Sequence, residues 1–176
     1  MSLIIVISGP ESVGKSTLCR KLADAYKAKA ITEYAREYVE KLNRPYAYFD
    51  LVNIARKQKE AFENIEDLEE KLVFFDTGPE ITKVWFEEVY QKVPKFLDDF
   101  LRKLPVNLYL LCQTDLEWKY DKTRENKGKK REYLYDRYKT LINQFNYNYS
   151  EISGFGQKRF LNAKKAIDSA HDLQNL

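Results

Sequence analysis

A glycine-rich loop near the start of the chain constrains the fold more than any other feature. Residues 9–16 read Gly-Pro-Glu-Ser-Val-Gly-Lys-Ser, which fits the pattern G-x-x-x-x-G-K-[ST] without a mismatch. An apolar run at residues 3–7 precedes the loop, and Leu18, Leu22 and Ala25 follow it at helical spacing. The order strand, loop, helix is the context in which this pattern forms a phosphate-binding loop. We therefore expect the chain to bind a nucleoside triphosphate.

The residue types of this loop suit ATP and Mg²⁺. Gly9 and Gly14 let the backbone curl, so that successive N–H groups face phosphate oxygens at the positive end of the next helix. Lys15 is expected to reach the β and γ phosphates during the reaction, and the Ser16 hydroxyl to bind Mg²⁺. The residues that we predict to hold ATP here are Gly9, Glu11, Ser12, Val13, Gly14, Lys15, Ser16 and Thr17.

The length and charge of the chain limit the classes of protein that it fits. With 176 residues it is long enough for one buried core and short for two, so we predict one domain over residues 1–176. Charged residues make up 32% of the chain, but the net charge is only +3. Because no strong field of one sign results, a small anionic substrate is expected rather than nucleic acid or a membrane as the main partner. The sequence makes no prediction of oligomeric state.

The cysteines and the N-terminal residues point to a cytoplasmic protein. Cys19 and Cys112 lie far apart, in a pattern that fits neither a disulfide framework nor a metal site. The first apolar run is too short for a membrane span, and it lacks the basic leader and cleavage site of a signal peptide. A reducing cytosol is therefore the expected location.

Acidic side chains follow two further strand patterns. Residues 72–75 form an apolar run that ends in Asp76, which resembles the Walker B pattern and predicts a second Mg²⁺-side ligand beside Ser16. A strand expected at residues 29–32 delivers Glu33 and Arg36 to the sheet edge at which ligands bind. A surface ion-pair patch is the alternative interpretation of these two residues.

Two other residues are candidates for the substrate side. Asp50 is predicted to be the N-cap of a helix that continues through Ile54, Phe62 and Ile65. Trp85 has the spacing of a core residue, and a wall of a nucleobase pocket is its alternative role.

A basic segment, residues 118–131, follows a strand expected at residues 106–112. We expect it to form a mobile lid that closes over the triphosphate, excludes water and stabilises the charge of phosphoryl transfer. Arginine favours this role because its guanidinium binds phosphate bidentately, whereas a merely solvated charge run is the alternative. The lid arginines are Arg124 and Arg131.

The order of the elements predicts the fold class. A helix expected at residues 132–145, a short strand at residues 149–152 and a C-terminal helix complete the alternation of strands and helices. We predict a P-loop α/β three-layer sandwich, with a mostly parallel sheet of about five strands and helices on both faces. Residues 126–129 read Asn-Lys-Gly-Lys and lack the Asp with which GTPases bind guanine, which disfavours a GTPase.

Five short blocks, taken together, carry a resemblance to a known family. The blocks are Gly9-x-Glu11-Ser12-x-Gly14-Lys15-Ser16-Thr17-Leu18, Glu33-Tyr34-x-Arg36-Glu37, Asp50 with Ile54-Ala55-x-x-Gln58, Asp76-Thr77 with Thr82-Lys83-x-Trp85, and Asp115-x-x-Trp118-x-x-Asp121-x-x-Arg124. In this order they resemble the ribosylnicotinamide kinase domain of the NadR-like NAD-biosynthesis proteins, over nearly the whole chain.

The resemblance implies transfer of the ATP γ-phosphoryl group to the 5′-hydroxyl of nicotinamide riboside. The further domains of the full-length relatives do not fit in 176 residues, so a stand-alone kinase is expected. The resemblance also implies that Glu33, Arg36 and Asp50 face the riboside, and that Arg124 and Arg131 close the lid. A carboxylate beside the attacking hydroxyl orients it and accepts its proton, and Glu33 is the first choice for that base before Asp50. Two alternatives stay open: a kinase of another nucleoside, nucleotide or polynucleotide end, and an ATP-dependent switch without an acceptor.

Overall fold

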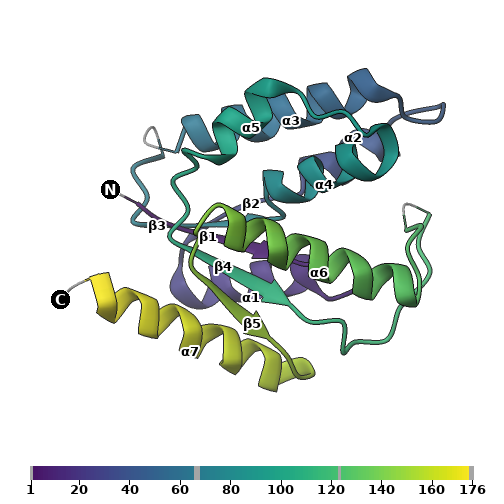
Figure 1. The fold of residues 1–176 in the computed structure, drawn as a ribbon. Helices are drawn as coiled ribbons and strands as arrows, with labels where there is room; N and C mark the ends of the chain where they lie inside the picture. Colours follow the sequence, from purple (N-terminus) through teal and green to yellow (C-terminus); the bar gives the residue numbers. More distant parts are fainter. Residues whose placement is uncertain (1, 66–67, 123, 175–176) are drawn as a thin grey trace.

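A parallel sheet between two layers of helices forms the body of the molecule (Figure 1). The computed structural model describes residues 2–65, 68–122 and 124–174. The strands are β1 (Leu3–Ser8), β2 (Lys29–Ile31), β3 (Leu72–Asp76), β4 (Leu108–Cys112) and β5 (Tyr149–Ile152). The helices are α1 (Lys15–Tyr26), α2 (Tyr34–Glu40), α3 (Tyr48–Glu63), α4 (Pro79–Tyr90), α5 (Lys95–Leu101), α6 (Lys129–Gln144) and α7 (Gly156–Gln174). The predicted fold class is confirmed.

The strand order places the end of β1 in the middle of the sheet. The five described strands run in the order β2-β3-β1-β4-β5, and every pair is parallel, where the sequence predicted a mostly parallel sheet. The chain leaves β1 toward β2 on one side, and it crosses from β3 to β4 on the other side of β1. In open α/β sheets a crevice for ligands opens at the carboxyl ends of strands where the connections diverge in this way.

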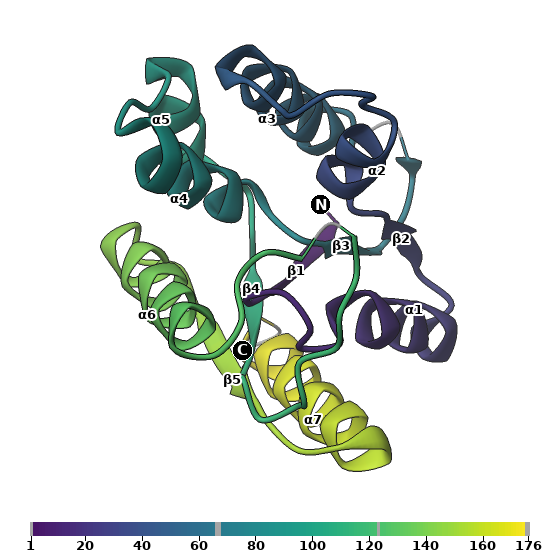
Figure 2. The same ribbon diagram turned by 90° about the vertical axis from the view of Figure 1, so that its right-hand side faces the viewer.

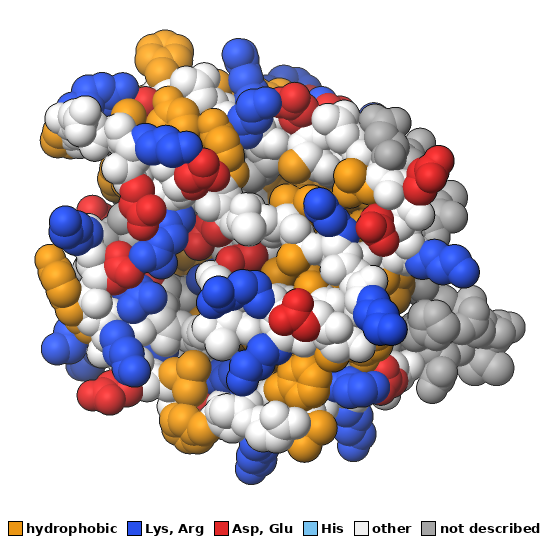
Figure 3. Space-filling model, turned by 180° about the vertical axis from the view of Figure 1, so that it is seen from behind, with side chains coloured by type: hydrophobic (Ala, Val, Ile, Leu, Met, Phe, Trp, Pro, Cys, Tyr) orange, Lys and Arg blue, Asp and Glu red, His pale blue; other side chains and the backbone are white. Residues whose placement is uncertain are grey.

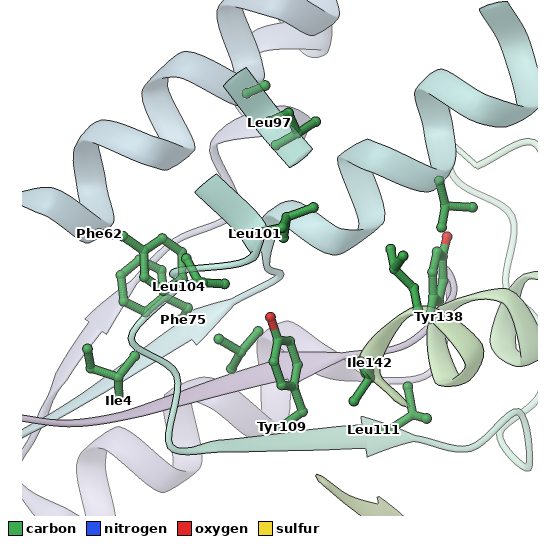
Figure 4. Close-up of a cluster of buried hydrophobic side chains, with 14 of the residues drawn as sticks. Ile4, Phe62, Phe75, Leu97, Leu101, Leu104, Tyr109, Leu111, Tyr138 and Ile142 are labelled. Carbon is green, nitrogen blue, oxygen red and sulfur yellow. The ribbon is translucent and has the colours of Figure 1, made fainter. Parts of the chain in front are cut away.

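The two faces of the sheet are covered by different helices (Figures 1 and 2). On one face α1 and α7 pack on a small apolar layer that includes Ile5, Ile7 and Leu110. On the other face α3, α4, α5 and α6 cover a larger, aromatic layer. Figure 4 shows this second cluster, in which the rings of Phe62 and Phe75 stack with their centroids 3.8 Å apart.

Several element boundaries differ from the sequence predictions, among them the starts of β4 and α6 and both ends of α3. Helix α3 begins at Tyr48, so Asp50 is its third residue and Ala47 is the N-cap. The Asp50 carboxylate accepts the Ala47 N–H at 2.7 Å, as the third residue of a helix does in a capping box. In the sequence alone, an acid at this position resembles an N-cap residue. Helix α3 ends at Glu63, before Ile65, and α6 begins at Lys129, inside the expected lid. Helix α5 was not predicted.

On the face seen from behind in Figure 3, the surface charges are of both signs. Lysine, arginine, aspartate and glutamate side chains are interspersed there, and the hydrophobic side chains form separate small groups (Figure 3). No helix in the described part of the chain combines the length and the apolar character that a bilayer crossing requires.

Candidate active site

The phosphate-binding loop connects β1 to α1 and needs glycine at both of its ends. At Gly9 the φ angle is 132°, and a Cβ would lie 2.7 Å from the Cys112 carbonyl oxygen. At Gly14, the N-cap of α1, the φ angle is 78°. The Lys15 ammonium folds back over the loop and donates to the carbonyl oxygens of Gly9 and Pro10, at 2.9 Å each. The loop therefore already holds its cation above the start of α1.

A cavity of about 690 Å³ lies beside this loop, at the carboxyl edge of the sheet. One side, here called the phosphate side, consists of the loop and the lid segment; its predicted residues are Gly9, Glu11, Ser12, Val13, Gly14, Lys15, Ser16, Thr17 and Arg124. The opposite side, here called the helix side, comes from α2, α4, α6 and the loop before α3. Its main residues are Glu33, Arg36, Tyr46, Trp85, Glu88, Leu134 and Tyr138.

Glu33 lies between the two sides of the cavity. It is the N-cap residue of α2, but its side chain caps nothing and stays half-buried in the cavity wall. Burial raises the pKa of its carboxyl, the Asp76 charge adds to this rise, and Lys15 and Arg36 oppose it. Glu33 therefore interacts electrostatically with Lys15 on the phosphate side and with Arg36 on the helix side.

Arg36 joins the helix side to the lid. Its guanidinium donates to Glu40 on the same helix at 2.8 Å and to Asp121 in the lid segment. Because Arg36 lines the cavity as well, it holds α2 and the lid together at the cavity mouth.

The donors beside the loop fit a magnesium ion. Asp76, at the end of β3, is buried, and its Oδ1 atom has no hydrogen-bond partner among the described residues. Burial raises the pKa of Cys19, and the Asp76 charge adds to this rise; Cys19 lies one turn along α1 from Ser16. Carboxylate and hydroxyl oxygens are the ligands that Mg²⁺ takes from proteins, and an unsatisfied buried carboxylate oxygen is otherwise costly. Ser16 lines the cavity whereas Asp76 does not, so the assignment of Mg²⁺ to this pair stays a prediction.

Loop residue Ser12 fastens the start of the lid segment. Its hydroxyl accepts the N–H of Lys119 at 2.8 Å and donates to the Glu117 carbonyl oxygen at 3.4 Å. Arg131, in the first turn of α6, donates to the Ser12 carbonyl oxygen at 3.0 Å. Arg131 is buried, which lowers the pKa of its guanidinium, and it does not line the cavity. Figure 2 shows the green lid segment crossing in front of the loop.

Loop residue Glu11 fastens the far part of the lid. Its carboxylate accepts the backbone N–H groups of Glu125, at 3.1 Å, and of Asn126. Arg124, between these contacts, donates to the Lys119 carbonyl oxygen at 2.7 Å and lines the cavity. Glu11, Ser12 and Arg131, all expected to hold the nucleotide, thus join the lid to the loop in this structure.

Asp50 lies apart from the cavity. Its two carboxylate oxygens accept both terminal nitrogens of Arg44, at 2.7 and 2.9 Å, and the Tyr38 hydroxyl at 3.0 Å. Arg44 and the Ala47 N–H hold the pKa of this carboxyl well below its usual value. Of the three residues that the sequence grouped around the riboside, Glu33 and Arg36 line the cavity and Asp50 does not.

Sequence reasoning identified one residue of the aromatic wall and missed the rest. Trp85 lines the cavity, and its ring meets the edge of Tyr46 with centroids 4.8 Å apart. Leu134 and Tyr138, four residues apart on α6, complete this wall; their spacing reads as ordinary core. Glu88 was also missed: Lys130, Tyr133 and Arg137 donate to it, an arrangement that depends on α4 and α6 meeting.

The turn after β5 is tied to the segment after β4. Asp115 accepts the Gly154 N–H at 2.6 Å and also the guanidinium of Arg159, which donates to the Gly154 carbonyl oxygen at 2.8 Å. These bonds fix the turn, and Gly154 does not line the cavity.

Comparisons with known proteins agree with this geometry. The sequence profile of a family described as AAA domain (AAA_28) matches residues 4–159. The trifunctional NAD biosynthesis/regulator protein NadR of Salmonella typhimurium (strain LT2) is 25% identical over 126 residues, which are 68% of this chain and 30% of that protein. The chain thus spans less than a third of that relative's length.

Two solved structures show the same fold. A crystal structure of NadR protein in complex with NR has a TM-score of 0.74 and 23% identity, over 96% of this chain and 51% of that chain. A structure of deoxyadenosine kinase from M. mycoides has a TM-score of 0.67 and 13% identity, over 95% of this chain and 100% of that chain.

Proposed function

We propose that this chain, which belongs to the AAA domain family AAA_28, transfers the γ-phosphoryl group of ATP to the 5′-hydroxyl of nicotinamide riboside. The observation that carries the proposal is the cavity of about 690 Å³ that joins a phosphate-binding loop to an aromatic wall, with Glu33 between them. A nucleotide switch needs no second compartment beside the phosphates. A kinase needs one, because the acceptor must lie next to the γ-phosphoryl group.

The choice of acceptor rests on two supports. The relative with the NAD-biosynthesis name is similar over 68% of this chain, and the NadR structure with the same fold was solved with NR. The helix side also suits a flat ring attached to a ribose, since Trp85 and Tyr46 present aromatic surface to the cavity. Arg36 and Glu33 offer polar groups for the ribose hydroxyls.

In the proposed reaction the acceptor oxygen forms a bond to the γ-phosphorus while the bond from that phosphorus to the β,γ-bridging oxygen breaks. Glu33 orients the hydroxyl and takes its proton, and ADP leaves. Its raised pKa makes it a stronger base than an ordinary glutamate. Asp50, the alternative base, keeps its carboxylate on Arg44 and the Ala47 N–H, so we assign it a structural role.

Positive charge on the phosphate side stabilises the transferring group. Lys15 exchanges its carbonyl partners for phosphate oxygens, and Arg124 approaches from the lid. Ser16 and Asp76 would hold Mg²⁺, which when bound neutralises charge on the β and γ phosphates. The lid excludes water through its attachments to Ser12, which favours transfer to the riboside over hydrolysis.

The test is ADP release from ATP and Mg²⁺ in the presence of nicotinamide riboside, nicotinic acid riboside, adenosine or uridine. We expect strong stimulation by nicotinamide riboside and formation of nicotinamide mononucleotide in equal amount to ADP. Stimulation by another nucleoside alone would keep the kinase and replace the acceptor. If no acceptor stimulates ADP release, the switch gains support and the proposed reaction is wrong.

A further inference from the structure

A buried glutamate outside the cavity lining has no role in the reaction described so far. Glu80, in the first turn of α4, is only 2% exposed. Its Oε1 atom accepts the hydroxyl of Ser8 at 2.7 Å, and its Oε2 atom meets no hydrogen-bond donor of suitable geometry among the described residues. A Cβ at position 78 would collide with Oε2, so only Gly78 leaves room for this side-chain position.

A carboxyl group in this position destabilises the fold. Burial with few hydrogen bonds costs a carboxylate several kcal/mol, or else the group takes up a proton. Burial accordingly raises the pKa of Glu80 to about 7, against the lowering effects of Ser8, its own backbone N–H, the Tyr109 hydroxyl and Lys15. A leucine or methionine would fill the same space at lower cost, and unfavourable groups of this kind concentrate where function requires them.

The partner of Glu80 connects it to both halves of the reaction. Ser8 is the last residue of β1 and directly precedes Gly9, where the phosphate-binding loop begins. Glu80 is on α4, the helix that carries Trp85 and other residues of the helix side of the cavity. The Ser8–Glu80 hydrogen bond is therefore a direct link between the element that holds the phosphates and the helix that walls the acceptor.

We propose that Glu80 is a positioning residue, which acts through Ser8 to fix the distance between the phosphate-binding loop and α4. By this link it holds the γ-phosphoryl group and the acceptor hydroxyl at a reactive separation. The proposal rests on the phosphoryl-transfer part of the proposed function, not on the choice of nicotinamide riboside. Because a misplacement of about 1 Å costs on the order of 10²-fold in rate, loss of this link lowers turnover without removing either binding site.

The test compares Glu80→Ala, Glu80→Gln, Ser8→Ala and the double variant Ser8→Ala/Glu80→Ala, assayed with the acceptor that the wild type uses best. We expect the single alanine variants to lower kcat about 10- to 100-fold, with KM for ATP changed less than about threefold. The double variant is no slower than the slower single variant, because both remove the same bond. Glu80→Gln keeps most of the turnover, since its amide oxygen still accepts the Ser8 hydroxyl.

Two controls separate positioning from loss of structure. Glu87→Ala removes a glutamate of the same helix whose partners are Lys83 and Arg137, and we expect kcat to stay within about twofold of the wild type. Thermal unfolding of each variant shows that it is folded at the assay temperature. If Glu80→Ala does not fold, Ser8→Ala and Glu80→Gln still test the proposal. Ser8→Ala removes only the hydroxyl that donates the hydrogen bond, and Glu80→Gln replaces the accepting carboxylate by an amide of the same shape.

The outcomes are distinct. The proposal would be overturned if Ser8→Ala is folded and has the kcat of the wild type. It would also be overturned if Glu80→Gln is as slow as Glu80→Ala, because the loss of turnover would then come from loss of the charge. A wild type that phosphorylates no acceptor would overturn the phosphotransferase function and this role together. That failure is seen in the wild type before any variant is compared, so it is not confused with failure of the Glu80 link alone.

Discussion

The two sides of the cavity are built in different ways. The phosphate side is built mainly by the loop, a run of consecutive residues, 9–17, whose backbone curls around one place and whose geometry depends on two glycines, and the lid segment joins it. The helix side is assembled from the side chains of α2, α4, α6 and the loop before α3, which meet only when the chain is folded. Recognition of the triphosphate is therefore a local property of the sequence, whereas recognition of the acceptor is a tertiary one.

This difference has a consequence for function. A backbone cradle accepts the triphosphate that is common to all P-loop kinases, and it leaves little room for variation. A wall of side chains changes with each substitution, so the same scaffold accepts different nucleosides when the helix side changes. Substitutions on the phosphate side should abolish turnover with every acceptor. Substitutions in the aromatic wall of the helix side should lower turnover with one acceptor and leave others less affected.

The largest effect is expected on the phosphate side, from Lys15→Ala. Removal of the ammonium takes away charge that stabilises the transferring phosphoryl group, and we expect kcat to fall on the order of 10³-fold with every acceptor. Lys21→Ala, on an exposed part of α1, is the matched control and should leave kcat unchanged. The assay is ADP release at saturating ATP. Turnover retained by Lys15→Ala would contradict the assignment of the loop.

Glu33→Gln tests the residue at which the two sides meet. Without the base we expect kcat to fall about 10²-fold, a smaller loss than in Lys15→Ala. Because only the ionised carboxylate accepts a proton and burial raises its pKa above 4.5, wild-type kcat/KM should rise with pH through a value above 4.5. The glutamine variant should lose this acidic limb of the pH profile.

The control for Glu33→Gln lies one turn along the same helix. Glu37→Gln removes a surface partner of Lys41 and should leave both kcat and the pH profile as in the wild type. A Glu33→Gln profile with the wild-type acidic limb would assign the base to another group.

The same contrast explains how much of the molecule the sequence predicts. The strands were predicted at the right places because parallel strands that are buried on both faces are continuous apolar runs, as in residues 72–75. Asp50 was misplaced because an acid three positions into a helix and an N-cap acid produce the same local pattern. Its pairing with Arg44 depends on how the loop before α3 folds back, which no spacing rule contains.

The candidate site divides in the same way. The loop residues, Glu33 and Arg36 follow strand ends, and strand ends of a parallel sheet meet at one edge, so the sequence brings them to the cavity. Tyr46, Leu134 and Tyr138 escaped notice because a cavity wall and a packed core use the same residue types. The roles of Glu11 and Ser12 as lid contacts depend on where the lid folds, which its composition does not reveal.

On the helix side, Trp85→Ala should act on the acceptor alone. It removes the aromatic surface and the edge contact with Tyr46, and we expect kcat/KM for the acceptor to fall about 10- to 100-fold, roughly the effect of losing one ring contact and its buried area. KM for ATP should not change, because no loop contact is lost. Trp85→Phe keeps a ring and should recover most of the loss. If kcat/KM for ATP fell by the same factor, Trp85 would belong to the phosphate side.

The smallest effect on turnover is expected from Glu11→Ala, which tests whether the lid belongs to the phosphate side. The Glu11 carboxylate binds the N–H groups of Glu125 and Asn126, and such charged hydrogen bonds contribute about 1.5–3 kcal/mol each at most. Ser12 and Arg36 still hold the lid, and loss of a negative charge beside the triphosphate offsets part of the damage, so kcat should change less than about fivefold.

The direct measurement for this variant is amide hydrogen exchange in the lid. Exchange at Glu125 and Asn126 should become faster in Glu11→Ala, because these N–H groups lose their acceptor, while exchange in the central strands stays slow. Glu117→Ala is the matched control, since Ser12 contacts only the backbone carbonyl of Glu117. Unchanged exchange at both amides would show that Glu11 does not hold the lid, and the phosphate side would then end at the loop.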